Sequence, residues 1–397
     1  MRCNQFTVPA TDDAGLAFRN GREMTPSLKP SPSGRGQGEG KQIPGFIFRP
    51  FLNRRCFLSG LAAGSLAIGL GDRARGEPKD PEKSAVELIT PAAARAIERG
   101  LNLLATRQDE DGSFRSGGYS RNVAICGLAG MAFMSSGSTP GRGPYGRNVE
   151  RCIEFILANT QESGFINIPN ASSHGPMYGH GFATLFLAEC YGMTKRPDIR
   201  DKLSKAVHLI VNTQNNEGGW RYQPQRHDAD ISVTICQIMA LRAARNAGLF
   251  VPRETIDRCT DYVKRSQNAD GGFMYMIQGG QSAFPRSAAG IVALYSAGIY
   301  EGQEIKKGLE YVMGFMPQAH EFNRESHYFY GHYYAVQAMW QAGGEYWAKW
   351  YPAVREALVA RQAEDGSWND SICMEYGTAM ACIILQIPNN YLPIFQR

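Results

Sequence analysis

Four short segments of the chain carry side chains that could do chemistry, and each of them precedes or opens a strongly apolar stretch. These segments are His227-Asp228-Ala229-Asp230, Tyr178-Gly179-His180, Tyr330-Gly331-His332 and Glu375-Tyr376-Gly377. A carboxyl group held in an apolar cavity can keep its proton and act as a general acid. Imidazole nitrogens and carboxylate oxygens together can bind zinc. These residue types therefore allow acid catalysis, metal binding or the binding of a ligand.

Each segment has a chemical interpretation and a structural one. Asp230, with Asp228 beside it, is the candidate catalytic acid, and zinc is the one cofactor considered, with His180, His332 and Asp230 as candidate ligands. Structurally, Asp230 could instead cap the helix that follows, and the histidines could hydrogen-bond loop backbone. The candidate ligand-binding residues are His180, His332, Tyr178, Tyr330, Tyr376, Glu375 and His227.

Several other kinds of site are not indicated. The sequence contains no phosphate-binding glycine loop, no His-Glu-x-x-His motif and no Cys-x-x-Cys pair. Asp257 and Cys259 have a spacing that suits metal ligands, but they fall on a helix expected on the outside of the fold. A carbohydrate-active site would need paired carboxylates across a cavity, for which Glu375 and Asp228 are the candidates.

A repeated motif defines the elements that must position these residues. A glutamine is followed after three or four positions by a glycine and then by an aromatic residue, and the first four glutamines are spaced 53 residues apart. Repeats of this length are typical of stacked supersecondary units. The motif begins at Gln108, Gln161, Gln214, Gln267 and Gln362, with Met316 in place of glutamine in the fifth of six units.

Each unit is predicted to contain two helices. One is amphipathic and ends at the glutamine, whose side-chain amide we expect to donate to the last carbonyls of that helix. The other is apolar on nearly all sides, as in Ala288-Ala289-Gly290-Ile291, and should be packed on all sides. The amphipathic helices are expected at 92–108, 147–161, 198–214, 253–267, 303–316 and 350–362, and the apolar helices at 121–136, 179–191, 230–247, 284–298, 330–342 and 375–387. Twelve helices in two concentric rings would form an all-α, (α/α)6 toroid.

The repeat resembles a known family. Arg99-Gly100, Leu103-Leu104, Gln108 and Gly112-x-Phe114 are similar to the QW repeat of squalene and oxidosqualene cyclases, and looser forms occur in protein prenyltransferase β-subunits. The resemblance covers about residues 90–388. It implies an α/α toroid of the terpenoid cyclase and protein prenyltransferase superfamily, with a central cavity whose mouth is built from the N-terminal ends of the inner helices.

The resemblance extends in part to the acid motif. Asp228-x-Asp230 resembles the Asp-x-Asp-Asp motif of class II terpene cyclases, which implies Asp230 as the acid that protonates an alkene or epoxide. Ile231 stands where that motif has its last aspartate, and a single toroid is half of the familiar cyclase. The aromatic residues of the fifth unit would suit an isoprenoid chain or a carbocation.

The N-terminal region resembles a leader. Arg54-Arg55 and Phe57-Leu58 precede a weakly apolar run that ends at Leu70, as in a twin-arginine export signal. We therefore expect a disordered or untranslated extension at 1–48, a signal peptide at 49–76, a linker at 77–89 and the toroid at 90–397. This predicts a periplasmic or extracellular protein that is not integral to the membrane once the signal is removed.

Charge narrows the range of partners. The formal net charge is +5, but residues 1–76 hold 11 Lys and Arg against 5 Asp and Glu, so the rest of the chain is close to neutral. It lacks the basic surface that nucleic-acid binding requires. The sequence favours an exported toroid that binds a hydrophobic, isoprenoid-like ligand or a peptide. A cyclase- or prenyltransferase-like enzyme with Asp230 as the acid is the alternative.

Overall fold

The computed structural model describes residues 85–115, 117–194, 196–317 and 327–396. All of these belong to one compact unit of the chain, Ala74–Arg397. The expected N-terminal extension and export signal lie outside the described residues. Within the described residues twelve α-helices, α2 to α13, are present, and the only β-pairings there are isolated bridges. The prediction of an all-α fold is confirmed.

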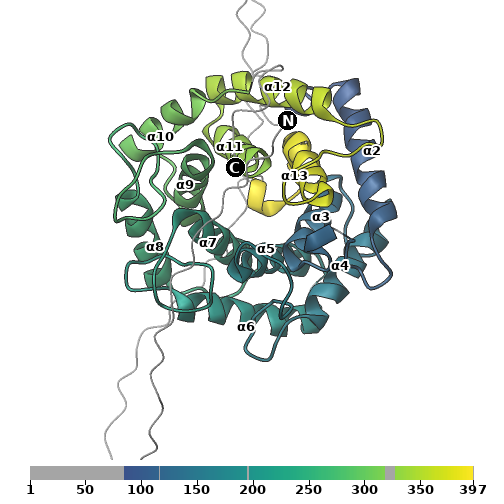
Figure 1. Cartoon of the computed structure of the whole chain (residues 1–397), viewed down its shortest axis with the longest axis horizontal. Helices are drawn as coiled ribbons and strands as arrows, with labels where there is room; N and C mark the ends of the chain where they lie inside the picture. The colour runs from purple at the N-terminus through teal and green to yellow at the C-terminus, as the bar shows by residue number, and fades with distance from the viewer. Residues whose placement is uncertain (1–84, 116, 195, 318–326, 397) are drawn as a thin grey trace, which may run out of the picture. The chain divides into compact units, whose positions relative to one another are not determined.

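The helices alternate between two concentric rings (Figure 1). The outer ring contains α2 (Pro91–Arg107), α4 (Gly146–Ala158), α6 (Pro197–Thr213), α8 (Arg253–Arg265), α10 (Gln303–Met313) and α12 (Gly344–Arg361). The inner ring contains α3 (Val123–Ser135), α5 (Pro176–Thr194), α7 (Ile231–Asn246), α9 (Phe284–Ala297), α11 (Tyr328–Ala342) and α13 (Met374–Gln386). Each inner helix packs on the next, and α13 packs on both α3 and α2. The ring is therefore closed, as the six-unit repeat predicts.

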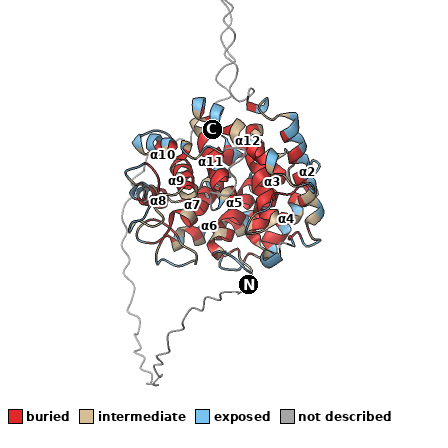
Figure 2. Ribbon diagram, turned by 45° about the horizontal axis from the view of Figure 1, so that its top comes forward, coloured by how far each residue is buried: buried red, intermediate tan, exposed pale blue. Residues whose placement is uncertain are grey.

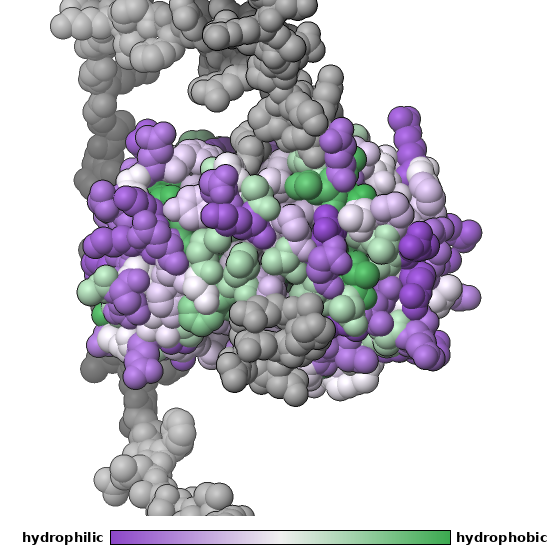
Figure 3. Space-filling view, turned by 90° about the horizontal axis from the view of Figure 1, so that it is seen from above, coloured by the Kyte–Doolittle hydropathy of each residue, from purple (hydrophilic) through white to green (hydrophobic). Residues whose placement is uncertain are grey.

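Burial separates the two rings (Figure 2). Along α9 every residue from Ser287 to Ser296 is buried, whereas α8 buries five residues on one side. Hydrophilic side chains are spread over the outside of the ring in the view of Figure 3. Helices with one apolar stripe thus enclose helices that are apolar all round, which is the arrangement that buries both. Among the described residues no helix is both long enough and apolar enough to cross a membrane.

The glutamines join neighbouring outer helices. The Gln214 side-chain amide donates to the carbonyl of Gly218 and to that of Thr255 in α8, both at 2.9 Å. The expectation that it donates to its own helix is wrong, because Gln214 is itself the C-cap, with extended backbone. This turns its side chain toward the next outer helix. Gly218 has φ 102°, and a Cβ there would lie 2.1 Å from the carbonyl oxygen of Arg258, so only glycine fits.

The second unit has a different register from the one expected. Thr160 pairs with Ile166, as Gln108 pairs with Phe114 in the first unit, and Gly164 follows Thr160 by four positions. Gln161 is exposed. Thr160 therefore takes the structural place of the glutamine in this unit, because the fixed distance to the positive-φ glycine sets the register.

The last outer helix starts earlier than expected. α12 begins at Gly344 and contains Pro352 in its interior, although a proline removes one helical hydrogen bond. Trp347, Trp350 and Tyr351 are buried against the inner ring. Burial of these three large side chains stabilises the turns before the proline.

Candidate functional site

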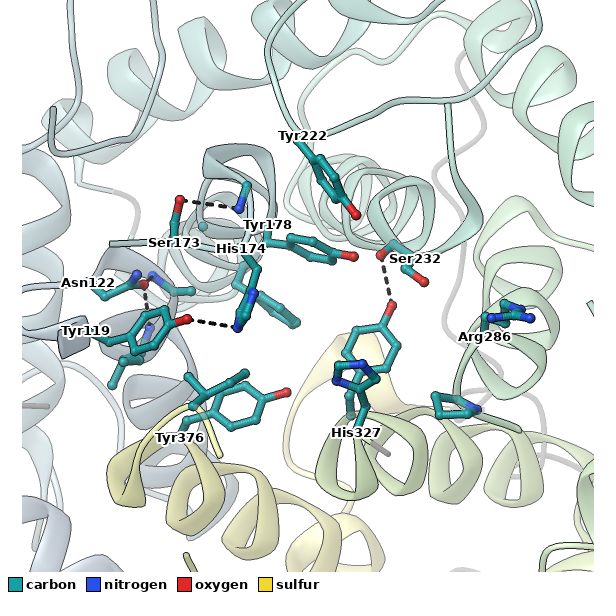
Figure 4. A pocket seen from close by; sticks show the side chains of 18 of the residues that line it. Tyr119, Asn122, Ser173, His174, Tyr178, Tyr222, Ser232, Arg286, His327 and Tyr376 are labelled. Carbon is teal, nitrogen blue, oxygen red and sulfur yellow. Dashed lines mark hydrogen bonds between the residues drawn. The ribbon is translucent and has the colours of Figure 1, made fainter. Parts of the chain in front are cut away.

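A cavity of about 530 Å³ lies at one end of the inner ring. It is lined by residues from the first turns of all six inner helices and from the loops that precede them. The resemblance to the QW-repeat toroids implied a cavity mouth at this position. The lining residues labelled in Figure 4 are Tyr119, Asn122, Ser173, His174, Tyr178, Tyr222, Ser232, Arg286, His327 and Tyr376, and Tyr330 also lines the cavity.

The three tyrosines predicted at inner-helix mouths all line this cavity. The Tyr330 hydroxyl donates to the Ser232 carbonyl at 2.8 Å. The hydroxyls of Tyr178 and Tyr376 extend into the space (Figure 4) and have no hydrogen-bond partner among the described residues. Burial raises the pKa of both side chains, so both keep their protons. Each can therefore donate a hydrogen bond to a ligand.

Tyr119 and His174 form an aromatic pair in the cavity lining. The Tyr119 hydroxyl lies 2.8 Å from Nε2 of His174, and the two rings stack with centroids 5.6 Å apart. Asn122 holds the two segments together: its Oδ1 accepts from the Ala124 amide at 2.8 Å and its Nδ2 donates to the Ser172 carbonyl at 3.0 Å. Asn122, the N-cap of α3, thus fixes the loop before α5 beside the cavity.

An ion-pair network lies beside the cavity. Arg221 contacts Asp228 at 3.1 Å and Asp230 at 3.7 Å. Its guanidinium also lies over the rings of Tyr222 and Tyr275, at 4.8 and 5.5 Å from their centroids. The hydroxyls of these two tyrosines hydrogen-bond to each other, and both rings line the cavity. They therefore separate the buried carboxylate from the ligand space.

Asp230 is the N-cap of α7. Its Oδ1 accepts from the Val233 amide at 2.9 Å, as the capping interpretation predicted. The side chain is fully buried and is not part of the cavity lining. Burial raises its pKa to about 6, although the Val233 amide and Arg221 act in the opposite direction. Asp230 is thus a buried capping carboxyl that lies behind the residues lining the cavity.

The two candidate histidines do not face the cavity. His180 Nδ1 accepts from the Ile166 amide at 3.2 Å, and its Nε2 lies 3.3 Å from the Ala206 carbonyl. Both ring nitrogens are thus used by backbone, and burial lowers the pKa of His180 to about 4. His332 packs against Phe284 and Trp350 with ring centroids 4.9 and 5.7 Å away, toward the outer ring.

These positions leave the zinc hypothesis without a site. His180, His332 and Asp230 do not converge, because each is directed to a different neighbour in the wall. Throughout the part of the chain that the structure describes, no group of three or more His, Cys, Asp or Glu side chains is placed to hold a metal ion. The expectation of a zinc site from these three residues is therefore corrected.

The remaining candidates also lie away from the cavity. Glu375 is buried and pairs with Arg107 of α2 at 2.5 Å, so it joins the last inner helix to the first outer helix. His227 is exposed and lies 3.7 Å from Asp228. Paired carboxylates therefore do not face each other across the cavity. Among its described lining residues there is no Asp or Glu, whereas Arg286, His174 and His327 are present.

Sequence reasoning missed several lining residues, and two of them carried a usable signal. Tyr222 follows Trp220 by two positions, and Tyr275 follows Phe273 by two positions. In both units the aromatic residue of the repeat is thus followed, two positions later, by a tyrosine that lines the cavity. Tyr119, His174 and His327 come from segments before the inner helices that vary in length between units, so no period could identify them.

The fold and the cavity together define a closed α/α toroid with a ligand-sized space at its axis. Residues 92–204 and 192–367 match the family described as the prenyltransferase alpha-alpha toroid domain. The chain belongs to this family, as the QW repeat indicated.

Solved structures share the fold at low sequence identity. The type II terpene cyclase MstE from Scytonema is 13% identical, with a TM-score of 0.52, over 78% of this chain and 99% of that chain. A GH76 α-mannanase from Bacteroides thetaiotaomicron is 11% identical, with a TM-score of 0.55, over 77% of this chain and 98% of that chain. A protein from Actinoplanes is 16% identical, with a TM-score of 0.51, over 75% of this chain and 99% of that chain. One fold thus serves both terpene and sugar chemistry, and the site must decide the function.

Proposed function

We propose that this protein binds a small amphipathic molecule whose apolar body lies in the central cavity. The observation that carries the proposal is the cavity itself, about 530 Å³ in volume and lined mainly by aromatic and aliphatic side chains from the inner helices and the loops before them. This volume is within the range of small-molecule sites, which are mostly apolar and contain a few polar groups.

The polar groups favour a ligand head that accepts hydrogen bonds. Tyr178 and Tyr376 offer hydroxyls that have no hydrogen-bond partner in the described part of the chain, and Arg286 adds a positive charge to the wall. The N-terminal ends of the inner helices add partial positive charge at the same end of the ring. A hydroxyl, carbonyl or carboxylate head group suits these donors, whereas a cationic head does not.

The solved relatives support an isoprenoid-like body. One structure of MstE contains geranylgeranyl dihydroxybenzoate, a long apolar chain on an oxygen-bearing ring, at 13% identity and a TM-score of 0.52. By contrast, the lack of carboxylates among the described lining residues disfavours glycoside hydrolysis here. A peptide would have to be short and apolar to enter the same space.

Direct binding measurements test this proposal. Geranylgeraniol should bind the purified toroid with measurable affinity in isothermal titration calorimetry, with a negative heat-capacity change from apolar burial. Ala124→Trp, which fills the cavity from the first turn of α3, should abolish this binding. Asn246→Trp, at the exposed C-terminal end of α7, is the matched control and should bind as the unmodified protein does. Equal binding by both variants would place the ligand outside the cavity.

Acid catalysis on the bound molecule is the second candidate function. It is favoured by one arrangement: Asp230 lies behind Tyr222 and Tyr275, whose hydrogen-bonded hydroxyls would have to relay its proton into the cavity, and burial raises the pKa of Asp230 to about 6. Asp230→Asn keeps an N-cap side chain but removes the acid. If Asp230 is the acid, incubation with a geranylgeranyl substrate should yield a cyclised product with the unmodified protein and none with the variant. Absence of product from both would leave the protein as a binder.

The cellular location of the protein is proposed from its sequence. We propose that the Arg54-Arg55 motif directs export, so that the ligand is met outside the cytoplasm. Replacing both arginines with lysine should retain the protein in the cytoplasmic fraction of a bacterial host with a twin-arginine pathway. Unchanged fractionation would contradict export by this route.

A further inference from the structure

Three side chains form a line from the N-cap of α7 to the cavity. Asp230 lies behind the cavity lining, and Tyr275 and Tyr222 belong to the lining. The Tyr275 hydroxyl faces the Asp230 carboxyl as a hydrogen-bond donor, and the hydroxyls of Tyr275 and Tyr222 hydrogen-bond to each other. In Figure 4 the Tyr222 hydroxyl points into the cavity, toward Tyr178 and Ser232. The buried carboxyl is therefore connected to the ligand space through two hydroxyls.

Backbone hydrogen bonds hold the two tyrosines in this order. The Ile231 amide donates to the Tyr275 carbonyl at 3.0 Å, which places Tyr275 beside the first turn of α7. The Met177 amide donates to the Tyr222 carbonyl at 3.1 Å, which places Tyr222 beside the first turn of α5. The Arg221 guanidinium lies over both rings. The positions of the two hydroxyls are thus fixed, whereas their hydrogens are free to rotate.

The direction of these hydrogen bonds depends on the proton of Asp230. An ionised Asp230 only accepts, so Tyr275 donates to it, Tyr222 donates to Tyr275, and the Tyr222 oxygen offers a lone pair to the cavity. A protonated Asp230 donates to Tyr275 instead. Tyr275 then donates to Tyr222, and Tyr222 donates its own proton into the cavity.

The proton of Asp230 has one acceptor within reach. Its Oδ1 accepts from the Val233 amide at 2.9 Å, whereas Oδ2 has no hydrogen-bond partner of ordinary geometry in the described part of the chain. The Arg221 Nε lies 3.7 Å from Oδ2, and a guanidinium offers donors only. A proton on Oδ2 is therefore directed toward the Tyr275 hydroxyl.

We infer that the protonation state of Asp230 sets whether Tyr222 accepts a hydrogen bond from the ligand head group or donates one to it. With Asp230 ionised, a head group that carries a donor, such as an alcohol, gains a hydrogen bond that an ether lacks. With Asp230 protonated, alcohol and ether are served alike. This selectivity rests on the proposed function, because it acts on the ligand in the cavity, and it requires no chemical conversion of that ligand.

Asp230 changes state within an accessible pH range. Burial raises its pKa to about 6, whereas the Val233 amide and Arg221 act in the opposite direction. It is therefore mostly protonated at pH 5 and ionised at pH 8. Burial also raises the pKa of the surrounding tyrosines and of the nearby thiol, so these groups keep their protons in this range. The titratable and charged groups that face Asp230 are Arg221, Asp228, Tyr178, Tyr222, Tyr262, Tyr275, Tyr330 and Cys236.

The test compares two isoprenoids that differ in one hydrogen-bond donor, geranylgeraniol and geranylgeranyl methyl ether. Isothermal titration calorimetry gives the Kd of each at pH 5 and at pH 8. The ratio of the ether Kd to the alcohol Kd should be about fivefold higher at pH 8, which is the value of one neutral hydrogen bond. The extra methyl group affects the ratio equally at both pH values. His174 and His327, which also line the cavity, act on both ligands alike.

Two variants should remove this pH dependence. In Asp230→Asn the side-chain oxygen keeps the cap on the Val233 amide, which directs the side-chain NH₂ to Tyr275 and makes Tyr222 a donor at every pH. The ratio should then stay at its pH 5 value. Tyr275→Phe keeps the ring but breaks the connection, so its ratio should be the same at both pH values. This second variant keeps the test decisive if the first one does not fold.

Asp228→Asn is the matched control. It removes a carboxylate that pairs with Arg221 at 3.1 Å but does not belong to the line of hydroxyls, so the rise in the ratio should persist. Loss of the rise in all three variants would assign it to the charge around Arg221 and overturn the inference.

The remaining outcomes separate the inference from the proposed function. If the unmodified protein binds both ligands at a ratio that does not change with pH, or if Asp230→Asn and Tyr275→Phe keep the rise, Asp230 does not set the direction of the hydrogen bonds and the inference alone fails. If the unmodified protein binds neither ligand at either pH, the proposed function fails and the inference fails with it.

Discussion

The side-chain amide of Gln362 donates to the backbone carbonyl of Ala96 at 2.8 Å, which joins the last outer helix, α12, to the first, α2. The same bond links Gln214 to Thr255 and Gln267 to Glu304. Closure of the ring thus uses the contact that also joins successive units. Gly366 packs closely against α2 as Gly218 packs against α8, since a Cβ on Gly366 would lie 3.0 Å from the carbonyl oxygen of Arg99.

Gln362→Ala should destabilise the toroid by about 1–3 kcal/mol, because it leaves buried carbonyls without their donor. Urea denaturation measures this change. Gln161→Ala is the matched control: Gln161 belongs to the sequence motif but is exposed, and its loss should change stability by less than about 0.5 kcal/mol. Similar losses in both variants would show that the glutamine acts through the local turn rather than through ring closure.

The two tryptophans of the repeat should be structural. Trp220 and Trp368 are buried, and their indole nitrogens donate to the carbonyls of Ile210 and Leu358 at 2.7 and 2.8 Å. Replacing either one with Ala should lower the free energy of unfolding by roughly 3–5 kcal/mol. Unchanged thermal unfolding would contradict this. Ligand affinity per folded molecule should stay the same, because neither indole lines the cavity.

Glu189 should make stability depend on pH. Burial raises its pKa to about 8, although the Ile394 amide and Arg242 act in the opposite direction. The folded state therefore favours the protonated carboxyl. Its stabilising effect is complete below the unfolded pKa of about 4.5 and is lost as the pH rises toward 8. Glu189→Gln should remove this decline, which amounts to at most about 5 kcal/mol.

Urea midpoints measured between pH 5 and pH 8 test the role of Glu189. The difference between the unmodified protein and Glu189→Gln isolates this group from the other titrating side chains. A difference that stays constant across this range would show that Glu189 titrates normally.

The sequence predicted the architecture well and the site only in part. Periodicity revealed both rings, because burial on one side or on all sides leaves a direct pattern in residue type. The positions of Tyr178, Tyr330 and Tyr376 followed from their place at inner-helix N-termini. The sequence did not predict in which direction each side chain of the first helical turn points. His332 lies two residues after Tyr330, about 200° around the helix, and this rotation turns it toward the outer ring.

Contacts between residues far apart in the sequence explain why the other candidate residues lie away from the cavity. Glu375 lies 268 positions from Arg107, its ion-pair partner, and Asp230 is shielded from the cavity by tyrosines of two different units. No local pattern encodes such pairings. The register shift at Thr160 shows a further limit, since the glycine that fixes the turn, rather than the glutamine, sets the phase of the repeat.

Tyr178 and Tyr376 allow binding and folding to be separated. Their hydroxyls have no hydrogen-bond partner among the described residues, so Tyr178→Phe and Tyr376→Phe should leave the free energy of unfolding within about 0.5 kcal/mol. Tyr330 differs, because its hydroxyl donates to the Ser232 carbonyl. Tyr330→Phe should therefore cost about 1 kcal/mol of stability.

For ligand affinity, the effects of the three substitutions should rank in the opposite order to their effects on stability. Loss of one neutral hydrogen bond to the ligand head weakens binding by about 1 kcal/mol, or about fivefold, so the Tyr178 and Tyr376 variants should bind geranylgeraniol less tightly. Tyr330→Phe should bind it nearly unchanged, since that hydroxyl is already used by the protein. Calorimetric titration of the three variants measures this. Full affinity in both the Tyr178 and Tyr376 variants would place the head group away from these hydroxyls and would require the ligand to enter the cavity in the opposite orientation.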